Sequence, residues 1–357
     1  MTAAPIAAGG AGHDGEDALL DDAAARDDDP GLAAGKPGQA AWRRHLARRN
    51  MTILLAAIAV FALFAVTTST FLTEFNLANM ARNVSLIGIV AVGMTLLFVV
   101  GEIDLSVGSL LGLLSICLGI MVADWSVNPW LAAAVVVGLG LLLGLFAGLI
   151  RILTNIPSFI VTLALLTAYR SLTLIISGER PRPADPQGSF FDFTGGTVWH
   201  LPWLAVWMLA VMAIGGFVLE RTRFGYHAYA TGGNLRAARQ SGIRTDQVKL
   251  MSFGITGALV GFAAALLFGY LHVAEPTSGT GFEFRVIGAV VVGGCALTGG
   301  QGTIFGTLIG TLIIGMITTG MVLLGFSQNV GDVANGALII GVGTIDLLLR
   351  RASRRHG

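Results

Sequence analysis

The chain has 357 residues, of which 54% are hydrophobic and only 12% are charged, and its formal net charge is +1. A soluble domain carries about 25% charged residues, so this composition excludes a protein whose whole surface faces water. The near-neutral charge gives no electrostatic basis for nucleic-acid binding, and the two isolated cysteines, Cys117 and Cys295, provide neither a disulfide framework nor a metal site.

The first segment, residues 1–41, is predicted to be a disordered tail. It is rich in Ala, Gly and Asp, includes the acidic run 27–29, and lacks the apolar core of a signal peptide. A group of arginines within residues 43–49 follows it, directly before the first apolar run. We expect this tail to be solvated rather than part of a folded domain.

Ten apolar runs follow the tail, and most are long enough for a membrane helix, which takes about 20 residues to cross a bilayer core. The runs cover residues 51–71, 84–101, 104–123, 131–150, 157–176, 201–219, 250–270, 284–298, 302–324 and 330–349. We therefore predict an all-α integral membrane protein of about ten transmembrane helices in one domain, residues 42–350, with a basic tail at residues 351–357. The run 284–298 is too short for a straight crossing.

The distribution of basic residues predicts the orientation of these helices, because loops on the cytoplasmic side are enriched in Lys and Arg. Placing the amino terminus inside and alternating ten crossings leaves most of the 22 Lys and Arg residues inside. Both termini are then cytoplasmic, the loop 220–249 is internal, and the loop 177–200 is the longest external one. An odd number of crossings would place a basic segment outside.

Two segments interrupt the apolar pattern, near residues 101–106 and at residues 293–303. The first contains Glu102 and Asp104, with almost no loop around them. Ionisable groups at membrane depth cost about 2.5–3.5 kcal/mol, so they usually face protein or water. The second is rich in glycine, and each glycine disfavours helix by about 1 kcal/mol. Irregular backbone inside a membrane is buried in protein or lines a cavity, so both breaks are candidate parts of a solute pathway.

The sequences that lead into the two breaks are similar. Residues 87–93 and 287–293 agree at most positions. Paired interrupted segments in two halves of a chain are the best sequence indication of a transport site. Because Ile, Val and Gly are abundant throughout the chain, chance similarity is the alternative, and the sequence leaves both open.

The polar residues of the two breaks are the candidate pathway residues. They are Glu102, Asp104, Ser106, Thr298, Gln301 and Thr303. Weak polar contacts suit a solute in transit, whereas strong contacts would trap it. Asp104 and Ser106 are also suited to cap the helix that follows, and the two roles can coexist. Elsewhere, Arg170 is interpreted as reaching the membrane interface, and Arg285 as pairing with Glu283 at the surface.

The internal loop 220–249 contains the signals of a short helix. Gly232 and Gly233 interrupt the chain, Asn234 is a good N-cap, and Gly242 is a natural residue to end the helix 235–241. A small rigid helix below the membrane suits docking into a partner protein. The alternative is a solvated loop that only follows the bias of positive charge to the inside.

Several motifs recur in a characteristic order over roughly residues 71–349. They are Phe71-Leu72-Thr73 with Asn76 and Asn79, Gly93-Met94-Thr95, residues 103–109, residues 157–163, Gly232-Gly233-Asn234 with Ser241-Gly242-Ile243, Pro276-Thr277 with Gly279-Thr280-Gly281, and residues 299–303. In these residues the chain resembles permeases of bacterial ABC importers for monosaccharides of the ribose, xylose and galactose type.

This resemblance implies a site that couples the permease to an ATPase. The coupling motif of such permeases is Glu-Ala-Ala, three residues, then Gly, and Ala237, Ala238 and Gly242 fit that spacing, whereas Arg236 stands at the Glu position. The residues that the resemblance assigns to coupling are Gly233, Asn234, Arg236, Ala237, Ala238, Ser241 and Gly242.

The resemblance also implies partners: an ABC ATPase subunit that holds ATP and Mg, a second permease copy or a paralogue, and an extracytoplasmic sugar-binding protein. The location implied is the inner membrane of a bacterium. The loop 177–200 is a candidate landing site for the binding protein, or else a passive connection. Permeases of the branched-chain amino acid type are an alternative, and an ion-coupled carrier that uses Glu102 or Asp104 is another.

The chain itself is not expected to bind ATP or to be an enzyme. A Walker A loop needs Gly, four residues, then Gly-Lys and Ser or Thr, so that backbone N–H groups surround the phosphates. At the single Gly-Lys, Gly35-Lys36, Pro30 stands where the first Gly belongs and Pro37 follows the Lys. The spans also contain no nucleophile with a nearby base, so no cofactor is expected in this chain.

Overall fold

The computed structural model describes residues 37–355, with the surroundings of side chains described for residues 51–341, 343 and 344. Most of the predicted tail and the last two residues therefore lie outside the described part. The chain divides after Arg49 into two units. In the first, residues 37–49 form the beginning of helix α2 (Pro37–Thr67), which starts before the predicted end of the tail at residue 41.

The second unit is built almost entirely of helices, which confirms the predicted all-α membrane class. Helices coincide with all ten apolar runs. Besides α2 they are α3 (Glu74–Val99), α4 (Val107–Gly119) with a π-helical turn η2 (Ile120–Asp124), α5 (Pro129–Thr154), α6 (Ser158–Ser177), α8 (Trp203–Arg221), α11 (Thr245–Leu271), α12 (Phe282–Val292), α13 (Ile304–Leu323) and α14 (Gln328–Arg355). Among the described residues, seven helices are long and apolar enough to cross a membrane, so the predicted count of about ten is not confirmed.

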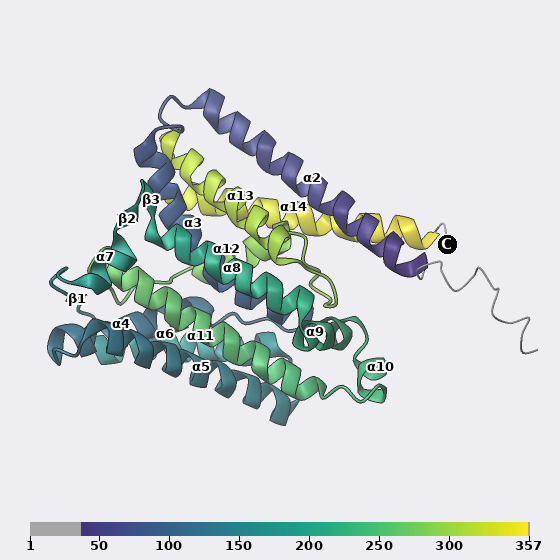
Figure 1. The fold of residues 1–357 in the computed structure, drawn as a ribbon, viewed down its shortest axis with the longest axis horizontal. Coiled ribbons are helices and arrows are strands. Elements are labelled where there is room, and N and C mark those ends of the chain that lie inside the picture. The colour runs from purple at the N-terminus through teal and green to yellow at the C-terminus, as the bar shows by residue number, and fades with distance from the viewer. Residues whose placement is uncertain (1–36, 356–357) are drawn as a thin grey trace, which may run out of the picture. The chain divides into compact units, whose positions relative to one another are not determined.

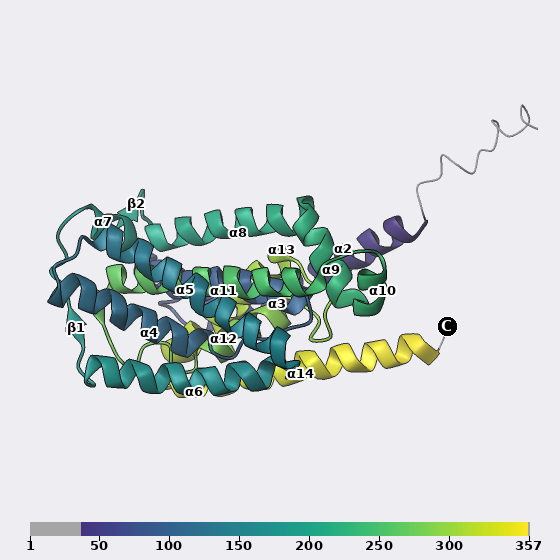
Figure 2. The same ribbon diagram turned by 90° about the horizontal axis from the view of Figure 1, so that it is seen from below.

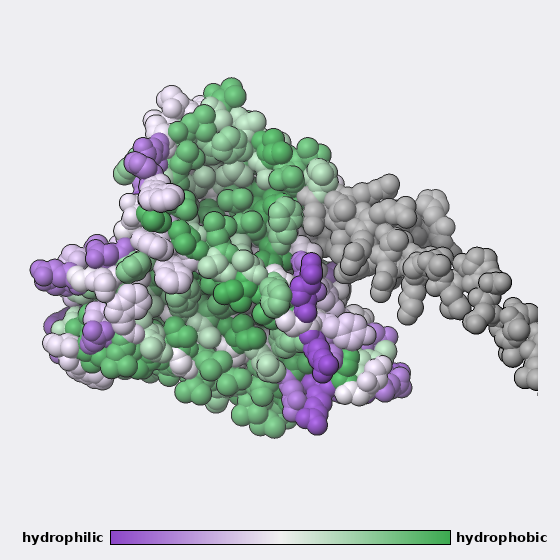
Figure 3. Space-filling view, viewed as in Figure 1, coloured by the Kyte–Doolittle hydropathy of each residue, from purple (hydrophilic) through white to green (hydrophobic). Residues whose placement is uncertain are grey.

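Short elements gather at the two ends of the long helices of this unit (Figure 1). One end holds α7 (Ser189–Gly195) and the strand pairs β1 (Arg182–Pro183) with β4 (Val273–Ala274) and β2 (Thr197–Val198) with β3 (Leu201–Pro202), both antiparallel. The opposite end holds α9 (Arg223–Gly233) and α10 (Leu235–Gln240). A hydrophobic surface lies between hydrophilic patches at these two ends, as a membrane-spanning bundle requires (Figure 3).

Helix α11 packs so closely on α5 that their backbones touch. A Cβ added at Gly140 or Gly144 of α5 would collide with the α11 backbone, and one added at Gly257 or Gly261 of α11 would collide with α5. Small residues spaced four apart allow this approach, which replaces the hydrophobic driving force that helices lack in lipid. The contact fixes the ends of both helices, which carry parts of the candidate site.

The chain re-enters the bundle after β4. Ala274 lies beside Gly119, at the carboxyl-terminal end of α4, whereas Gly279 lies against Gly108, near the start of that helix. Residues 275–281 therefore follow α4 for about 16 Å, at 1.5 Å per helical residue. This segment is not helical, and only beyond it does α12 begin.

Helix α12 is consequently a half-length helix. Its 11 residues span about 16 Å, which is roughly half of a bilayer core, so the shortness predicted for the run 284–298 is confirmed. Figure 2 shows α12 beside the longer α3 and α13. The predicted breaks are also confirmed, because α3 ends at Val99 and α4 begins at Val107, and no helix covers residues 293–303.

Candidate functional site

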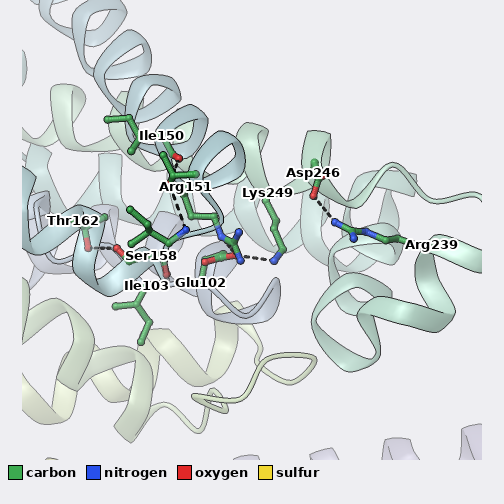
Figure 4. Close-up of polar contacts among 11 residues, drawn as sticks. Glu102, Ile103, Ile150, Arg151, Ser158, Thr162, Arg239, Asp246 and Lys249 are labelled. Atoms are coloured by element: carbon green, nitrogen blue, oxygen red, sulfur yellow. Dashed lines mark hydrogen bonds and ion pairs between the residues drawn. The ribbon is translucent and has the colours of Figure 1, made fainter.

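Glu102 lies in the first break and joins it to two helices. Its carboxylate is 3% exposed, and Oε1 accepts hydrogen bonds from Arg151 Nε at 2.7 Å and from Lys249 Nζ at 2.6 Å (Figure 4). Arg151 belongs to the last turn of α5 and Lys249 to the second turn of α11. Because a buried charge without a partner is costly, this ion triad holds the break against both helices.

Asp104 and Ser106 organise the start of α4. Asp104 is 1% exposed, and its Oδ1 accepts from the backbone N–H of Ser106 at 2.8 Å and from the Ser106 hydroxyl at 2.6 Å. This is an Asx turn, in which a carboxylate satisfies backbone donors just ahead of a helix. The N-cap residue of α4 is Ser106, and its side chain makes no cap hydrogen bond, so Asp104 stabilises the turn ahead of α4 and neither residue makes the expected N-cap bond to the helix.

Hydroxyl groups of α6 complete the first break. The N–H of Ile103 donates to Ser158 Oγ at 3.1 Å, and the N–H of Leu105 donates to Thr162 Oγ1 at 3.0 Å. These bonds satisfy backbone donors that no helix or sheet could pair, and so make an irregular segment tolerable at this depth. Figure 4 shows Ser158 and Thr162 on the same side of the break as Arg151.

The second break presents two exposed polar side chains and one buried cap. Thr303 Oγ1 accepts from the N–H of Gly306 at 3.0 Å and so caps α13, while Thr303 itself is buried. The N–H of Ala296 donates to the Gln301 carbonyl at 3.0 Å, which closes the loop on itself. The side chains of Thr298 and Gln301 are exposed. Of the six candidate pathway residues, these two therefore have the most accessible side chains.

The two breaks meet each other and the end of α9 through glycines. The N–H of Gly300 donates to the Val99 carbonyl at 2.9 Å. A Cβ added at Gly232 would collide with that same carbonyl and would lie 2.7 Å from the Gly300 nitrogen, and one added at Gly299 would lie 3.0 Å from Cα of Gly101. We call Gly101, Gly232, Gly233, Gly299 and Gly300 the glycine junction.

A tyrosine side chain reinforces this contact. The hydroxyl of Tyr229, in α9, donates to the carbonyl of Gly302 at 2.6 Å. Because both partners at the glycine junction are backbone, α9 cannot move relative to the second break without shifting the main chain. This contact was not predicted from the sequence, in which the adjacent glycines Gly232 and Gly233 are its signal.

Helix α10 has the ends that the sequence predicted. Asn234 Oδ1 accepts from the N–H of Ala237 at 3.0 Å, which is an N-cap bond, and Gly242 has a positive φ of 80° beyond the carboxyl end. Ala238 is buried, whereas Arg236 and Ala237 are exposed. The helix thus presents one face to the protein and another to its surroundings.

Helix α10 is connected to the ion triad through the start of α11. Arg239 donates from Nε to Thr245 Oγ1 at 3.0 Å and from Nη2 to Asp246 Oδ1 at 2.9 Å. Lys249 follows Asp246 by less than one turn on α11 and contacts Glu102. Figure 4 shows Asp246 and Lys249 with their respective partners Arg239 and Glu102.

The structure corrects two interpretations of charged residues. Arg170 does not reach for the membrane interface, because its Nη1 donates to the carbonyls of Pro276 at 3.2 Å and Ser278 at 3.3 Å in the re-entrant segment. Arg285 pairs with Asp332 at 2.9 Å rather than with Glu283. Residues two apart on a helix point in different directions, which is the physical reason that the second interpretation was wrong.

The contacts described above join the two breaks, α9, α10 and α11 into one connected arrangement. Among residues 37–355, no three His, Cys, Asp or Glu side chains come together in a way that could hold a metal ion. Residues 76–343 match the family model described as branched-chain amino acid transport system / permease component. The chain belongs to this permease family.

The sequences of individual relatives align with most of this chain. The probable ABC transporter permease protein YphD of Escherichia coli (strain K12) is 35% identical over 87% of this chain and 93% of its own length. The ribose import permease protein RbsC of Bacillus subtilis (strain 168) is 38% identical, over 76% of this chain and 84% of its own. The autoinducer 2 import system permease protein LsrC of Salmonella typhi is 31% identical, over 86% and 88%.

These similarities fix the class of the protein. The permease is a multi-pass membrane protein and a component of an ABC-type transport system, not the enzyme that hydrolyses ATP. The ion triad, the glycine junction and α10 are therefore parts of a transport machine.

Proposed function

We propose that the permease is the transmembrane subunit of an ATP-driven importer that carries a monosaccharide. The observation that carries this proposal is the 38% identity with a ribose import permease over 76% of the chain. The family description names branched-chain amino acids, but two of the relatives described above are named for the import of ribose and of autoinducer 2. No observation favours the amino acid alternative over the sugar.

The partners in this proposal are an ABC ATPase with ATP and Mg, a second permease copy or paralogue, and an extracytoplasmic sugar-binding protein. The basic loop 220–249 supports a cytoplasmic location for α9 and α10, since positive charge favours that side. Both termini are then cytoplasmic, the membrane is the inner membrane of a bacterium, and the loop 177–200 faces the binding protein on the outside.

Coupling in this proposal runs from α10 to both breaks. The ATPase docks on the coupling residues of the loop, with Arg236 and Ala237 on the exposed side of α10 and Gly233, Asn234, Ala238, Ser241 and Gly242 shaping it. Movement of α9 displaces the second break through the glycine junction. Movement of α10 reaches the first break by a second route, through Arg239, the start of α11 and the ion triad.

The two breaks form the cytoplasmic end of the sugar pathway in this proposal. Thr298 and Gln301, which are exposed, offer the weak polar contacts that a sugar in transit needs. Asp104, Ser106 and Thr303 hold the ends of α4 and α13 in place. Glu102 sets the position of the first break and shares its charge with two cations, which disfavours its use for an ion-coupled carrier.

The test is purification of the tagged permease from native membranes, followed by uptake of radiolabelled D-ribose into proteoliposomes. We expect an ATPase with two Walker A motifs to co-purify, and uptake to require ATP and the binding protein. Ala237→Glu adds charge and bulk on the exposed face of α10 without weakening the helix, since both residues are good helix formers. It should abolish co-purification of the ATPase.

Gln247→Glu is the matched control, because it adds the same charge at an exposed position just beyond the docking helix. It should leave ATPase recovery and uptake unchanged. Purification of the permease alone, with uptake driven by an ion gradient, would overturn the proposal and favour an ion-coupled carrier.

A further inference from the structure

A cavity lies between the amino-terminal end of α12 and α14, away from the breaks and from α10. Its volume is about 360 Å³, and its lining includes Phe284 and Arg285 from α12 and Asp332, Asn335 and Gly336 from α14. Sites for small molecules have volumes of about 300–1,000 Å³ and combine apolar walls with a few polar groups. This cavity has the size and the composition of such a site.

The polar groups of the cavity are arranged for hydrogen bonding. Arg285 donates from Nε and Nη2 to the two carboxylate oxygens of Asp332, at 2.9 and 3.0 Å. The side chains remain 22% and 43% exposed, so the pair is not sealed within the protein. Turned so that its oxygen faces Arg285, the amide of Gln328 accepts from Nη1 at 3.2 Å.

Asn335 adds an amide group that is incompletely used. The residue is 3% exposed, and its Nδ2 donates to Thr318 Oγ1 at 2.9 Å. Its Oδ1 is buried and has no hydrogen-bond partner among the described residues. A buried acceptor without a partner costs about 1–3 kcal/mol, so such a group needs an explanation. Because this oxygen has no exposed surface, a hydroxyl of a ligand would supply the missing bond once the amide turns toward the cavity.

The depth of the cavity makes these groups unusual. Helix α12 begins only after residues 275–281 have followed α4 into the bundle, so Arg285, in the first turn of α12, lies within the bundle rather than in the loop before it. Thr318, which contacts Asn335, lies five residues before the end of α13, so this contact is between one and two turns from the end of that helix. A partly exposed ion pair at membrane depth cannot face lipid cheaply, and by default it indicates a functional site.

We propose that this cavity is a transit site that contacts the sugar within the membrane. The inference rests on the proposed function, and it adds a location that lies before the cytoplasmic breaks. A monosaccharide presents pairs of neighbouring hydroxyls and an apolar C–H face. Arg285, Asp332 and Asn335 match the hydroxyls, and the ring of Phe284, which is 60% exposed, matches the C–H face.

Such a site needs only weak affinity. Sugar arrives from the binding protein at high local concentration, and tight binding would prevent its release toward the breaks. Because Asp332 already pairs with Arg285, a sugar hydroxyl would share that carboxylate rather than displace the arginine. The existing pair thus holds the acceptor in place and limits the strength of the new contact.

Filling the cavity tests the proposal without disturbing the backbone. Gly336 lines the cavity, and a Cβ at that position would have no heavy atom within 4 Å. Gly336→Phe should reduce ATP-driven uptake of D-ribose by about tenfold or more. The phenyl ring would occupy the cavity, so the sugar could no longer bind there and the site would contribute nothing to the rate of uptake. Gly336→Ala occupies far less of the space and should retain most of the uptake.

Gly341→Phe is the matched control for this variant. Gly341 lies on the same helix, has equally open space at its Cβ, and does not line the cavity. The change gives the same gain in helix propensity and the same added bulk. We expect uptake close to wild type. For both variants, recovery of the ATPase and the rate of ATP hydrolysis by the purified assembly should match wild type.

The polar contacts are tested by a second matched pair. Asp332→Asn removes the charge of the acceptor that the sugar is proposed to share and should lower ribose uptake by about tenfold, because hydrogen bonds to charged groups are roughly twice as strong as neutral ones. Glu220→Gln is the control: Glu220 is an exposed carboxylate near the end of α8, and it does not line the cavity. It should transport normally.

The outcomes separate this inference from the proposed function. If wild type takes up no sugar in an ATP-dependent way, the proposed function fails and the transit site fails with it. If wild type takes up ribose and Gly336→Phe and Asp332→Asn do so equally well, only the transit site is overturned. Loss of uptake in those two variants with normal ATP hydrolysis, and with both controls active, supports the site.

Discussion

Glu102→Gln is expected to lower the free energy of unfolding of the permease more than Arg151→Gln, which removes one of the two cations that contact Glu102. The substitution keeps the size of the side chain but leaves the ammonium of Lys249, whose side chain is 7% exposed, without its counter-charge. Removal of one partner from a buried ion pair costs about 3–5 kcal/mol. Because Arg151 is 20% exposed and reaches water in part, we expect a loss near the lower end, about 3 kcal/mol.

Two further variants make this reasoning testable. Arg151→Gln leaves the pair of Glu102 with Lys249 intact and should cost only about 1 kcal/mol, as for a partly exposed ion pair. Glu102→Gln combined with Lys249→Met removes both buried charges and should regain most of the loss. The assay is unfolding of the purified permease in detergent by titration with SDS, followed by tryptophan fluorescence. Equal losses for the two single variants, or no recovery in the double variant, would refute the argument.

Three other predictions concern the glycine junction, α10 and the re-entrant segment. Gly232→Ala should lower ribose uptake and cost about 1–3 kcal/mol because its Cβ collides with backbone, whereas Gly233→Ala, with nothing within 4 Å, should be tolerated; uptake and SDS unfolding compare them. Asn234→Ala should cost about 1 kcal/mol of cap energy and speed hydrogen exchange of the α10 amides, with exchange in α5 unchanged. Arg170→Leu should increase proteolysis and exchange at residues 275–281, and unchanged protection there would count against its anchoring role.

The positions of the helices could be predicted from the sequence because hydrophobic runs dominate this chain. Each of the ten apolar runs coincides with a helix, and both breaks fall where charge or glycine interrupts the pattern. The ends of α10 were also predictable, since an N-cap at Asn234 and a positive φ at Gly242 are local properties. The number of membrane crossings could not be predicted in the same way, because the length and composition of an apolar run do not by themselves determine whether its helix crosses the bilayer.

Contacts between distant residues could not be predicted in the same way. Glu102 meets partners 49 and 147 positions away, and no local pattern joins these residues before the fold is known. The re-entrant segment 275–281 is short and polar, so by composition it is typical of an external loop. Its depth depends on the close approach of Gly279 to Gly108, which is a tertiary contact. The similarity of residues 87–93 to 287–293 does not extend to the helix ends, since α3 continues to Val99 whereas α12 stops at Val292.

The absence of side chains at the glycine junction has a mechanical consequence. Contacts between side chains absorb a displacement by changing rotamers, so part of any motion is lost at each interface. At the junction, the main chain of α9 meets the main chain of the second break directly, at Gly232 and Gly300. A displacement of α9 is therefore transmitted to the second break with little loss. In the proposed coupling, the length of the transport stroke is then set inside the permease, and the ATPase needs only to hold the exposed face of α10.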